Sequence, residues 1–152
     1  MSTKSYYAAT VQEFLNLKAE DILGCLAVRV GTEHSGDEAT QIRAWRTQIE
    51  LLKVSLSGLD SDEWGILLEM PLLRLGRRID AVILIKDVVA CVEFKIGASC
   101  FGSADIDQAV DYALCLRDFH AASHDLKVVP VLCADQAAEK SPSQEIEFFV
   151  LL

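Results

Sequence analysis

Residues 79–95 read IDAVILIKDVVACVEFK, and this stretch decides the fold of the chain. Two apolar, β-branched runs, Ile79–Ile85 and Val88–Phe94, are separated only by Lys86 and Asp87. Strand-forming runs on either side of a two-residue turn are typical of a β-hairpin. We therefore predict two antiparallel strands joined by a tight turn.

The charged residues of this hairpin gather at one end of it. Asp80 and Glu93 are equidistant from the turn, so the hairpin should pair them opposite each other. Glu93 and Lys95 lie two residues apart and should project from the same face of their strand. Carboxylate oxygens are ligands that Mg²⁺ takes, and a neighbouring lysine can orient or help to deprotonate a metal-bound water. The alternative interpretation is that these charges are simply solvated at strand ends.

The segments around the hairpin predict an α/β domain. Thr10 and Glu13 have the spacing of a capping box before a short helix. The other expected elements are helices over Asp21–Val30, Gln41–Ser57 and Ala104–Ala121, the last one capped by Ser103, and strands over Trp64–Met70, closed by Pro71, and Val128–Cys133. This order predicts a mixed β-sheet with helices on both faces.

The ends of the chain carry two further expectations. Residues 1–40 should form an N-terminal helical segment packed on a core of residues 41–152. The apolar stretch Ile146–Leu152 is expected to be a terminal core strand, or the place at which a longer protein was cut.

Composition limits the classes of function. The chain has 152 residues, 51% hydrophobic and 24% charged, which is ordinary for one globular domain. Its net charge of −9 excludes a generally basic nucleic-acid coat and a polybasic membrane binder. Five cysteines without CxxC spacing, and no apolar run near the length of a membrane span, lead us to expect free thiols and a cytoplasmic location.

One basic cluster stands out on this acidic chain. Arg74, Arg77 and Arg78 lie between the first two predicted strands, directly before Asp80. We expect them to contact the phosphates of a nucleic-acid strand. The alternatives are a solvated turn or pairing with the acidic flanks.

Two motifs together resemble a known family. The pattern Asp80-x12-Glu93-Phe94-Lys95 on a β-hairpin, followed by Gln108-x3-Tyr112 on a helix, resembles the PD-(D/E)XK nuclease superfamily and its RecB-like branch with a QxxxY element. Ile79 stands where that motif has proline, a position that only shapes the backbone. The chain also resembles the N-terminal nuclease-like domain that precedes a helicase-type ATPase in uncharacterised bacterial proteins. The stretches that carry this second resemblance are Ala44-Trp45-x2-Gln48-Ile49, Gly76-Arg77-Arg78-x-Asp80, Val92-Glu93-Phe94-Lys95, and Asp111-Tyr112-Ala113 through His120-x3-His124-Asp125.

The resemblance implies a fold, an activity and a set of roles. The implied fold is a restriction-endonuclease-like mixed β-sheet flanked by helices, and the implied reaction is hydrolysis of nucleic-acid phosphodiester bonds with Mg²⁺ or Mn²⁺. The implied site consists of Asp80, Glu93 and the backbone carbonyl of Phe94 as metal ligands, Lys95 to position the water, and Gln108 and Tyr112 lining it. DNA is the expected substrate ahead of RNA, and a helicase-type ATPase in the same or another chain is an expected partner. The competing hypothesis is a non-catalytic module of the same fold that binds nucleic acid or a protein partner.

Several further residues have a functional and a structural interpretation. Glu69 lies at a position of an apolar strand where polar residues are expected. Its functional interpretation is an outer metal ligand or the ligand of a second metal, and its structural interpretation is a charge on an edge strand. His120 and His124 have a spacing that can bind a metal, but we favour a helix C-terminal cap. The remaining residues are expected to be structural: Gln48 bonded to backbone or reaching Glu93, Cys91 as a small buried residue, and Trp45 and Trp64 in the core.

Overall fold

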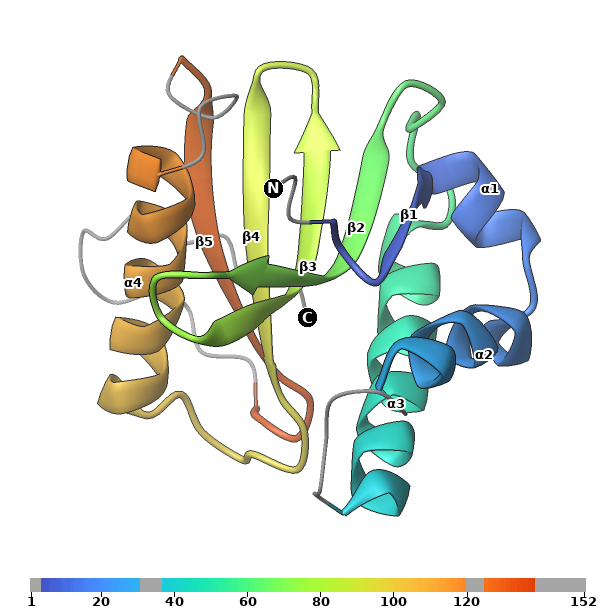
Figure 1. Cartoon of the computed structure of the whole chain (residues 1–152), viewed down its shortest axis with the longest axis horizontal. Helices are drawn as coiled ribbons and strands as arrows, with labels where there is room; N and C mark the ends of the chain where they lie inside the picture. The colour runs from blue at the N-terminus through green and yellow to red at the C-terminus, as the bar shows by residue number, and fades with distance from the viewer. Residues whose placement is uncertain (1–3, 31–36, 120–124, 139–152) are drawn as a thin grey trace.

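The computed structural model describes residues 4–30, 37–119 and 125–138, and its central element is a five-stranded sheet in the order β1-β2-β3-β4-β5 (Figure 1). The strands are β1 Tyr7–Thr10, β2 Gly65–Leu72, β3 Arg77–Ile85, β4 Val88–Lys95 and β5 Lys127–Ala134. Strands β1 to β4 pair antiparallel, whereas β5 runs parallel to β4 after the crossover helix α4, Ser103–Phe119. The predicted mixed α/β sheet with flanking helices is therefore confirmed.

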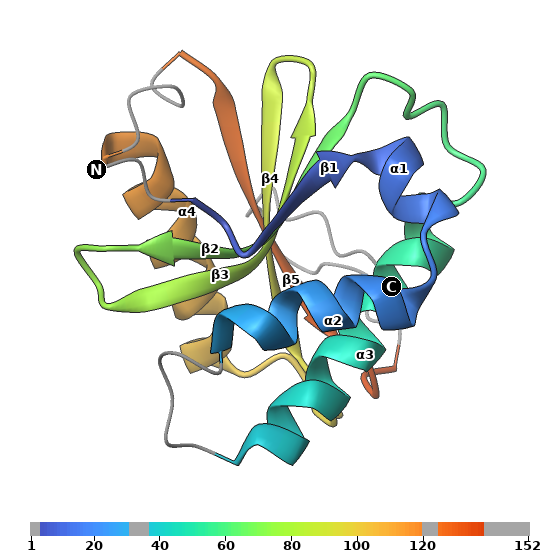
Figure 2. The same ribbon diagram turned by 45° about the vertical axis from the view of Figure 1, so that its right-hand side comes forward.

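Helices cover both faces of this sheet (Figures 1 and 2). On one face pack the helices α1 Val11–Asn16, α2 Ala19–Val30 and α3 Glu38–Leu56. On the other face lies α4, whose Tyr112 and Leu116 pack against Cys91 of β4. Alternate positions of β4 supply the two cores, since Val92 faces α1–α3 and Cys91 faces α4, as the two-residue period of a strand requires. The chain thus has two apolar cores separated by one sheet.

Local signals explain how α1 begins. The Thr10 hydroxyl accepts a hydrogen bond from the backbone N–H of Glu13 at 3.1 Å, and the Thr10 N–H donates to the Glu13 carboxylate at 2.9 Å. This is the predicted capping box, which satisfies two backbone donors at the start of the helix.

The β2–β3 hairpin bends at Glu69. This residue has a φ of 52°, in the left-handed region that non-glycine residues rarely adopt. Residues two apart on a regular strand point to the same face of the sheet. At this bend they do not, because Leu68 packs toward α1–α3 whereas Met70 packs with α4. The outer half of the hairpin, residues 70–79, is termed the arm; it extends over the α4 side of the sheet (Figures 1 and 2).

Three sequence predictions need correction. The N-terminal segment is not only helical, because residues 7–10 form the edge strand β1; a four-residue strand carries too weak a pattern to be recognised. Pro71 does not close β2 but lies within it, opposite Arg78. It is tolerated there because β1 pairs with β2 only as far as Leu68, so that beyond this residue no strand of the described ranges pairs with that edge of β2. Ser103 is the first residue of α4 rather than its cap, and the Gly102 carbonyl accepts the first helical hydrogen bonds.

Two expectations fall outside the described residues: the terminal strand Ile146–Leu152 and the caps formed by His120 and His124. Within the described ranges, no helix combines the length and the apolar character needed to cross a membrane.

Candidate functional site

Three acidic residues lie next to one another across the sheet, one on each of β2, β3 and β4. The register of β2 with β3 places Glu69 beside Asp80, and the pairing of β3 with β4 ends at Ala81 and Val92, the residues next to Asp80 and Glu93. The backbone N–H of Phe94 also donates to Oδ2 of Asp80 at 2.8 Å. The predicted hairpin is thereby confirmed, and its register brings Asp80 and Glu93 to the same end of it.

Gln108 of α4 connects the groups around Glu93. Its Nε2 donates to Oε1 of Glu93 at 2.8 Å and to the Tyr112 hydroxyl at 2.9 Å. Its Oε1 accepts a hydrogen bond from Nζ of Lys95 at 2.9 Å, and the same Nζ lies 3.7 Å from Oε1 of Glu93. Positions i and i+4 share one face of a helix, so Gln108 and Tyr112 reach the same point of the sheet. The structure therefore brings together the four residues that the sequence singled out on β4 and α4.

Both carboxyl groups of the hairpin lie in surroundings that favour their protonated forms. Glu93 is only 6% exposed, and burial, followed by repulsion from Asp80, raises its pKa from 4.5 to about 8. Burial also raises the pKa of Asp80 from 3.8 to about 7, although the hydrogen bond from Phe94 opposes the change. Both carboxyl groups therefore favour the protonated form more than exposed carboxyl groups do.

One buried atom of this site has no partner. Among the described residues, Oε2 of Glu93 accepts no hydrogen bond. A buried polar atom left in this way is costly unless it is protonated or binds something. Together with Asp80, it forms a donor set of oxygens, the kind that Mg²⁺ and Mn²⁺ take. No group of three or more acidic, histidine or cysteine side chains in the described ranges is arranged to hold an ion, so two carboxylates are the set available.

Comparison with known proteins does not add to this geometry. No family model, no curated protein and no solved structure matches the chain. The nuclease resemblance therefore stays a hypothesis that rests on Asp80, Glu93, Lys95 and the network around them.

Glu69 is held by a separate network. It is 3% exposed; its Oε1 accepts a hydrogen bond from the Trp45 indole at 2.8 Å and its Oε2 accepts one from Nε of Arg78 at 2.6 Å. The Arg78 guanidinium also lies over the Tyr6 ring, 5.1 Å from its centroid, and donates to the Tyr6 hydroxyl at 3.4 Å. Since both oxygens of Glu69 are engaged, the geometry favours an internal ion pair over a metal ligand. Glu69 thus lies just beyond the pairing of β1 with β2, as the edge-strand alternative expects, but it is buried and paired there.

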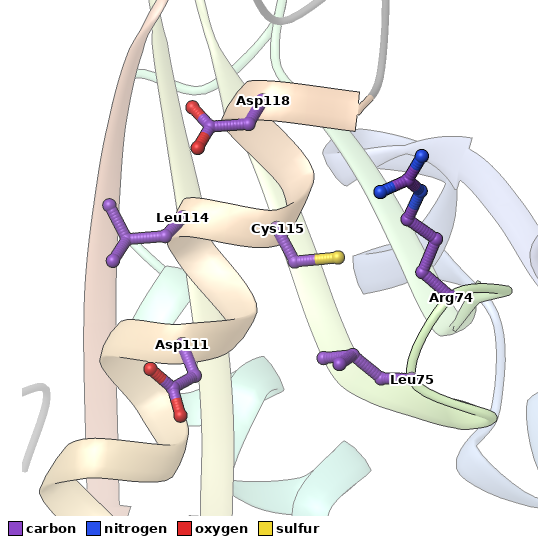
Figure 3. Close-up of a pocket in the computed structure, with 6 residues that line it drawn as sticks. All are labelled: Arg74, Leu75, Asp111, Leu114, Cys115 and Asp118. Atoms are coloured by element: carbon purple, nitrogen blue, oxygen red, sulfur yellow. The ribbon is translucent and has the colours of Figure 1, made fainter.

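The three arginines point to different places. Arg78 turns inward to Glu69. Arg77 is exposed, and its Nη1 lies 3.5 Å from the Tyr112 hydroxyl, at the rim of the candidate site. Arg74, at the tip of the arm, lines a groove against α4 (Figure 3). Of the three, Arg74 and Arg77 are exposed, and Arg78 is only partly so.

Sequence reasoning missed three contributors to these networks. Trp45 was expected only as core, and it is buried, but its indole also anchors Glu69. Asp105 lies 3.6 Å from Nζ of Lys95, and its place three residues before Gln108 on one helix was an available signal. Tyr6 carried no signal in the sequence. Cys91 is buried as predicted, and burial raises the pKa of its thiol, which does not suit a nucleophile.

Proposed function

We propose that this chain is a divalent-cation-dependent nuclease that hydrolyses phosphodiester bonds, in DNA ahead of RNA. The observation that carries the proposal is the buried carboxyl group of Glu93, with one oxygen unpartnered among the described residues, at the same end of the hairpin as Asp80 and beside Lys95. An apolar sheet has no packing reason to gather two carboxyl groups and a lysine in one patch. A restriction-endonuclease-like fold, Mg²⁺ or Mn²⁺ as cofactor and a cytoplasmic location belong to the same proposal.

The residues present fit such a cation. Asp80 and Glu93 offer carboxylate oxygens, and the backbone carbonyl of Phe94 would complete the protein ligands. Mg²⁺ is usually bound through one or two carboxylates and keeps several waters, so a third acidic side chain is not required. When bound, the ion would supply charge to polarise the phosphate and to lower the pKa of a water.

The other side chains of the site hold these groups in position. Gln108 fixes Glu93 through Oε1, and the Phe94 N–H fixes Asp80. Lys95 is held between Gln108, Glu93 and Asp105, so its ammonium group stays beside the carboxyl pair. From there it can donate a hydrogen bond to a water, or to a phosphate oxygen as negative charge develops. Donors fixed in advance in this way lose no free energy to reorganisation during the reaction.

Thermal melting with Mn²⁺ tests whether the cation binds. A ligand at 100 times its Kd that binds only the folded state stabilises it by about 2.7 kcal/mol. For a chain of this size that corresponds to a rise of about 5 to 11 °C in melting temperature. The wild type should show the rise and lose it in EDTA, and Asp80→Ala should not show it. The control Asp87→Ala, at the exposed turn of the same hairpin, should keep it.

Cleavage of labelled DNA tests the reaction itself. Lys95→Ala should stay folded and lose about 100-fold or more in rate, the scale expected for removal of one positioned donor. Cleavage by the wild type should also stop in EDTA. Wild-type protein that neither gains stability with Mn²⁺ nor cleaves DNA would contradict the proposal.

A non-catalytic module that binds a partner is the second candidate. The net charge of −9 and the engagement of Arg78 by Glu69 favour it, because both weaken attraction to phosphates. The partner proposed in this case is a helicase-type ATPase in the same or another chain. Binding of that partner should then survive Glu93→Ala, and Mn²⁺ should leave the melting temperature unchanged.

A further inference from the structure

A groove runs between the arm and the outer side of α4. Its larger part has a volume of about 570 Å³ and is lined by Arg74 and Leu75 of the arm and by four residues of α4, Asp111, Leu114, Cys115 and Asp118, of which Cys115 points to Leu75 (Figure 3). Its second part, of about 460 Å³, shares Leu75 and Asp111 with the first. The two parts therefore form one continuous path along the helix.

This path leads to the candidate site. The second part of the groove is also lined by Arg77, Gln108 and Tyr112. Gln108 and Tyr112 are hydrogen-bonded to each other, and Gln108 is hydrogen-bonded to Glu93. Glu93 itself is 6% exposed, so it is recessed behind the residues that line the groove. A polymer that follows the groove would pass over Gln108, which is hydrogen-bonded to Glu93.

The two walls of the groove carry opposite charge. The arm contributes Arg74 and Arg77, and α4 contributes Asp107 and Asp111, all four of them exposed. Asp118 adds less negative charge because it is ion-paired with Arg117 at 2.7 Å. Leu75 of the arm, 46% exposed, and Cys115 of α4 face each other between these charges, whereas Leu114 lies on the side of α4 away from the arm (Figure 3). The groove is thus basic on one side, acidic on the other and apolar in between.

We infer that this groove binds single-stranded nucleic acid and excludes a duplex, an inference that rests on the proposed nuclease function. A single strand has its phosphates along one side and unpaired base edges along the other. The phosphates can face the arm, while base amino groups donate to the carboxylates of α4 and base faces contact Leu75. A duplex carries phosphates on both outer sides, so one of its strands would be pressed against Asp107 and Asp111. It is also stiff, with a persistence length of about 150 base pairs, and cannot bend into a recessed site as a single strand can.

Binding measured without hydrolysis tests this inference. The probe is a labelled DNA of about 12 nucleotides, within the range of single-strand sites, alone or annealed to its complement. Fluorescence anisotropy is measured with Ca²⁺ in place of Mg²⁺, and again in EDTA. The single strand should bind at least about tenfold more tightly than the duplex in one or both buffers. Arg74→Ala/Arg77→Ala should lower the salt slope of single-strand binding by about 1.4, since each phosphate contact on a single strand contributes about 0.7.

Reversing the acidic wall provides the decisive comparison. Asp107→Lys/Asp111→Lys should strengthen duplex binding about tenfold or more and so remove most of the preference. Asp62→Lys/Glu63→Lys makes the same change of net charge on the exposed segment before β2 and should leave the ratio between the two probes unchanged. Equal binding of both probes, no binding of either, or an equal effect of the two lysine pairs would overturn the inference.

Cleavage assays distinguish a failure of this inference from a failure of the proposed nuclease function. Hydrolysis of duplex as fast as of single strand in Mn²⁺ would overturn the role of the groove and leave the nuclease proposal standing. A single-strand preference in binding without any hydrolysis would support the role of the groove and overturn the nuclease proposal.

Discussion

The buried ion pair of Glu69 with Arg78 makes a prediction about stability that does not depend on function. The side chain of Glu69 is 4% exposed and that of Arg78 is 22% exposed, with Nε and Oε2 2.6 Å apart. Arg78→Met keeps the length of the stem but leaves the Glu69 carboxylate buried with the Trp45 indole as its remaining hydrogen-bond donor among those described. Removing one partner of a buried pair costs about 3 to 5 kcal/mol because an uncompensated charge stays behind. For this chain that equals a fall of about 6 to 20 °C in melting temperature.

Urea unfolding at neutral pH, followed by circular dichroism, measures the loss. Glu69→Gln should cost less than Arg78→Met, because water can still reach the Arg78 guanidinium. The double variant Glu69→Gln/Arg78→Met should recover most of the loss, since its Gln carbonyl still accepts from Trp45 and no charge remains buried.

The surface pair of Arg46 with Glu20 is the matched control. Nη2 of Arg46 and Oε1 of Glu20 are 3.2 Å apart, but the two side chains are 46% and 68% exposed. Arg46→Met should therefore lower the free energy of unfolding by about 1 kcal/mol at most. If Arg78→Met cost no more than Arg46→Met, the reasoning from burial would be refuted.

Three further predictions follow from single residues. Lys86 has a φ of 52° in the exposed β3–β4 turn, so Lys86→Gly should raise the free energy of unfolding by up to about 1 kcal/mol, as measured in urea. The folded-state pKa of Glu93 lies above its ordinary value, so the stability that its protonated form contributes is lost as pH rises from 4.5 to about 8. The melting temperature of metal-free protein should fall over this window, and fall less in Glu93→Gln; an identical profile for the two proteins would contradict the assignment. Nζ of Lys53 donates to the carbonyls of Phe14 and Leu17 at the end of α1, at 2.6 and 2.5 Å. Lys53→Met should therefore lower the free energy of unfolding, measured in urea, by about 1 to 2 kcal/mol. An unchanged midpoint would show that water replaces these bonds.

The central hairpin could be predicted because its information is local. A two-residue turn fixes the register of the strands on either side, and that register pairs Ala81 with Val92 and so brings the neighbouring Asp80 and Glu93 to the same end of the hairpin. The helical period likewise places Gln108 and Tyr112 on one face of α4. What the sequence could not supply was the distance between β4 and α4, which the structure sets by packing Tyr112 and Leu116 against the sheet.

The amino-acid sequence by itself determined the elements, the hairpin register and the carboxyl pair with its lysine, because each depends on residues close together in the chain. Only the tertiary structure decided that Glu69 is buried in an ion pair with Arg78. Its ion-pair partner Arg78 is nine positions away, but its second partner Trp45 is 24 positions away, and Arg78 is contacted in turn by Tyr6, 72 positions from it. Its left-handed backbone, which a glutamate does not favour, bends β2 so that the arm crosses to α4 and forms the groove. Strain of this kind persists only where surrounding contacts impose it, and those contacts exist only once the chain has folded.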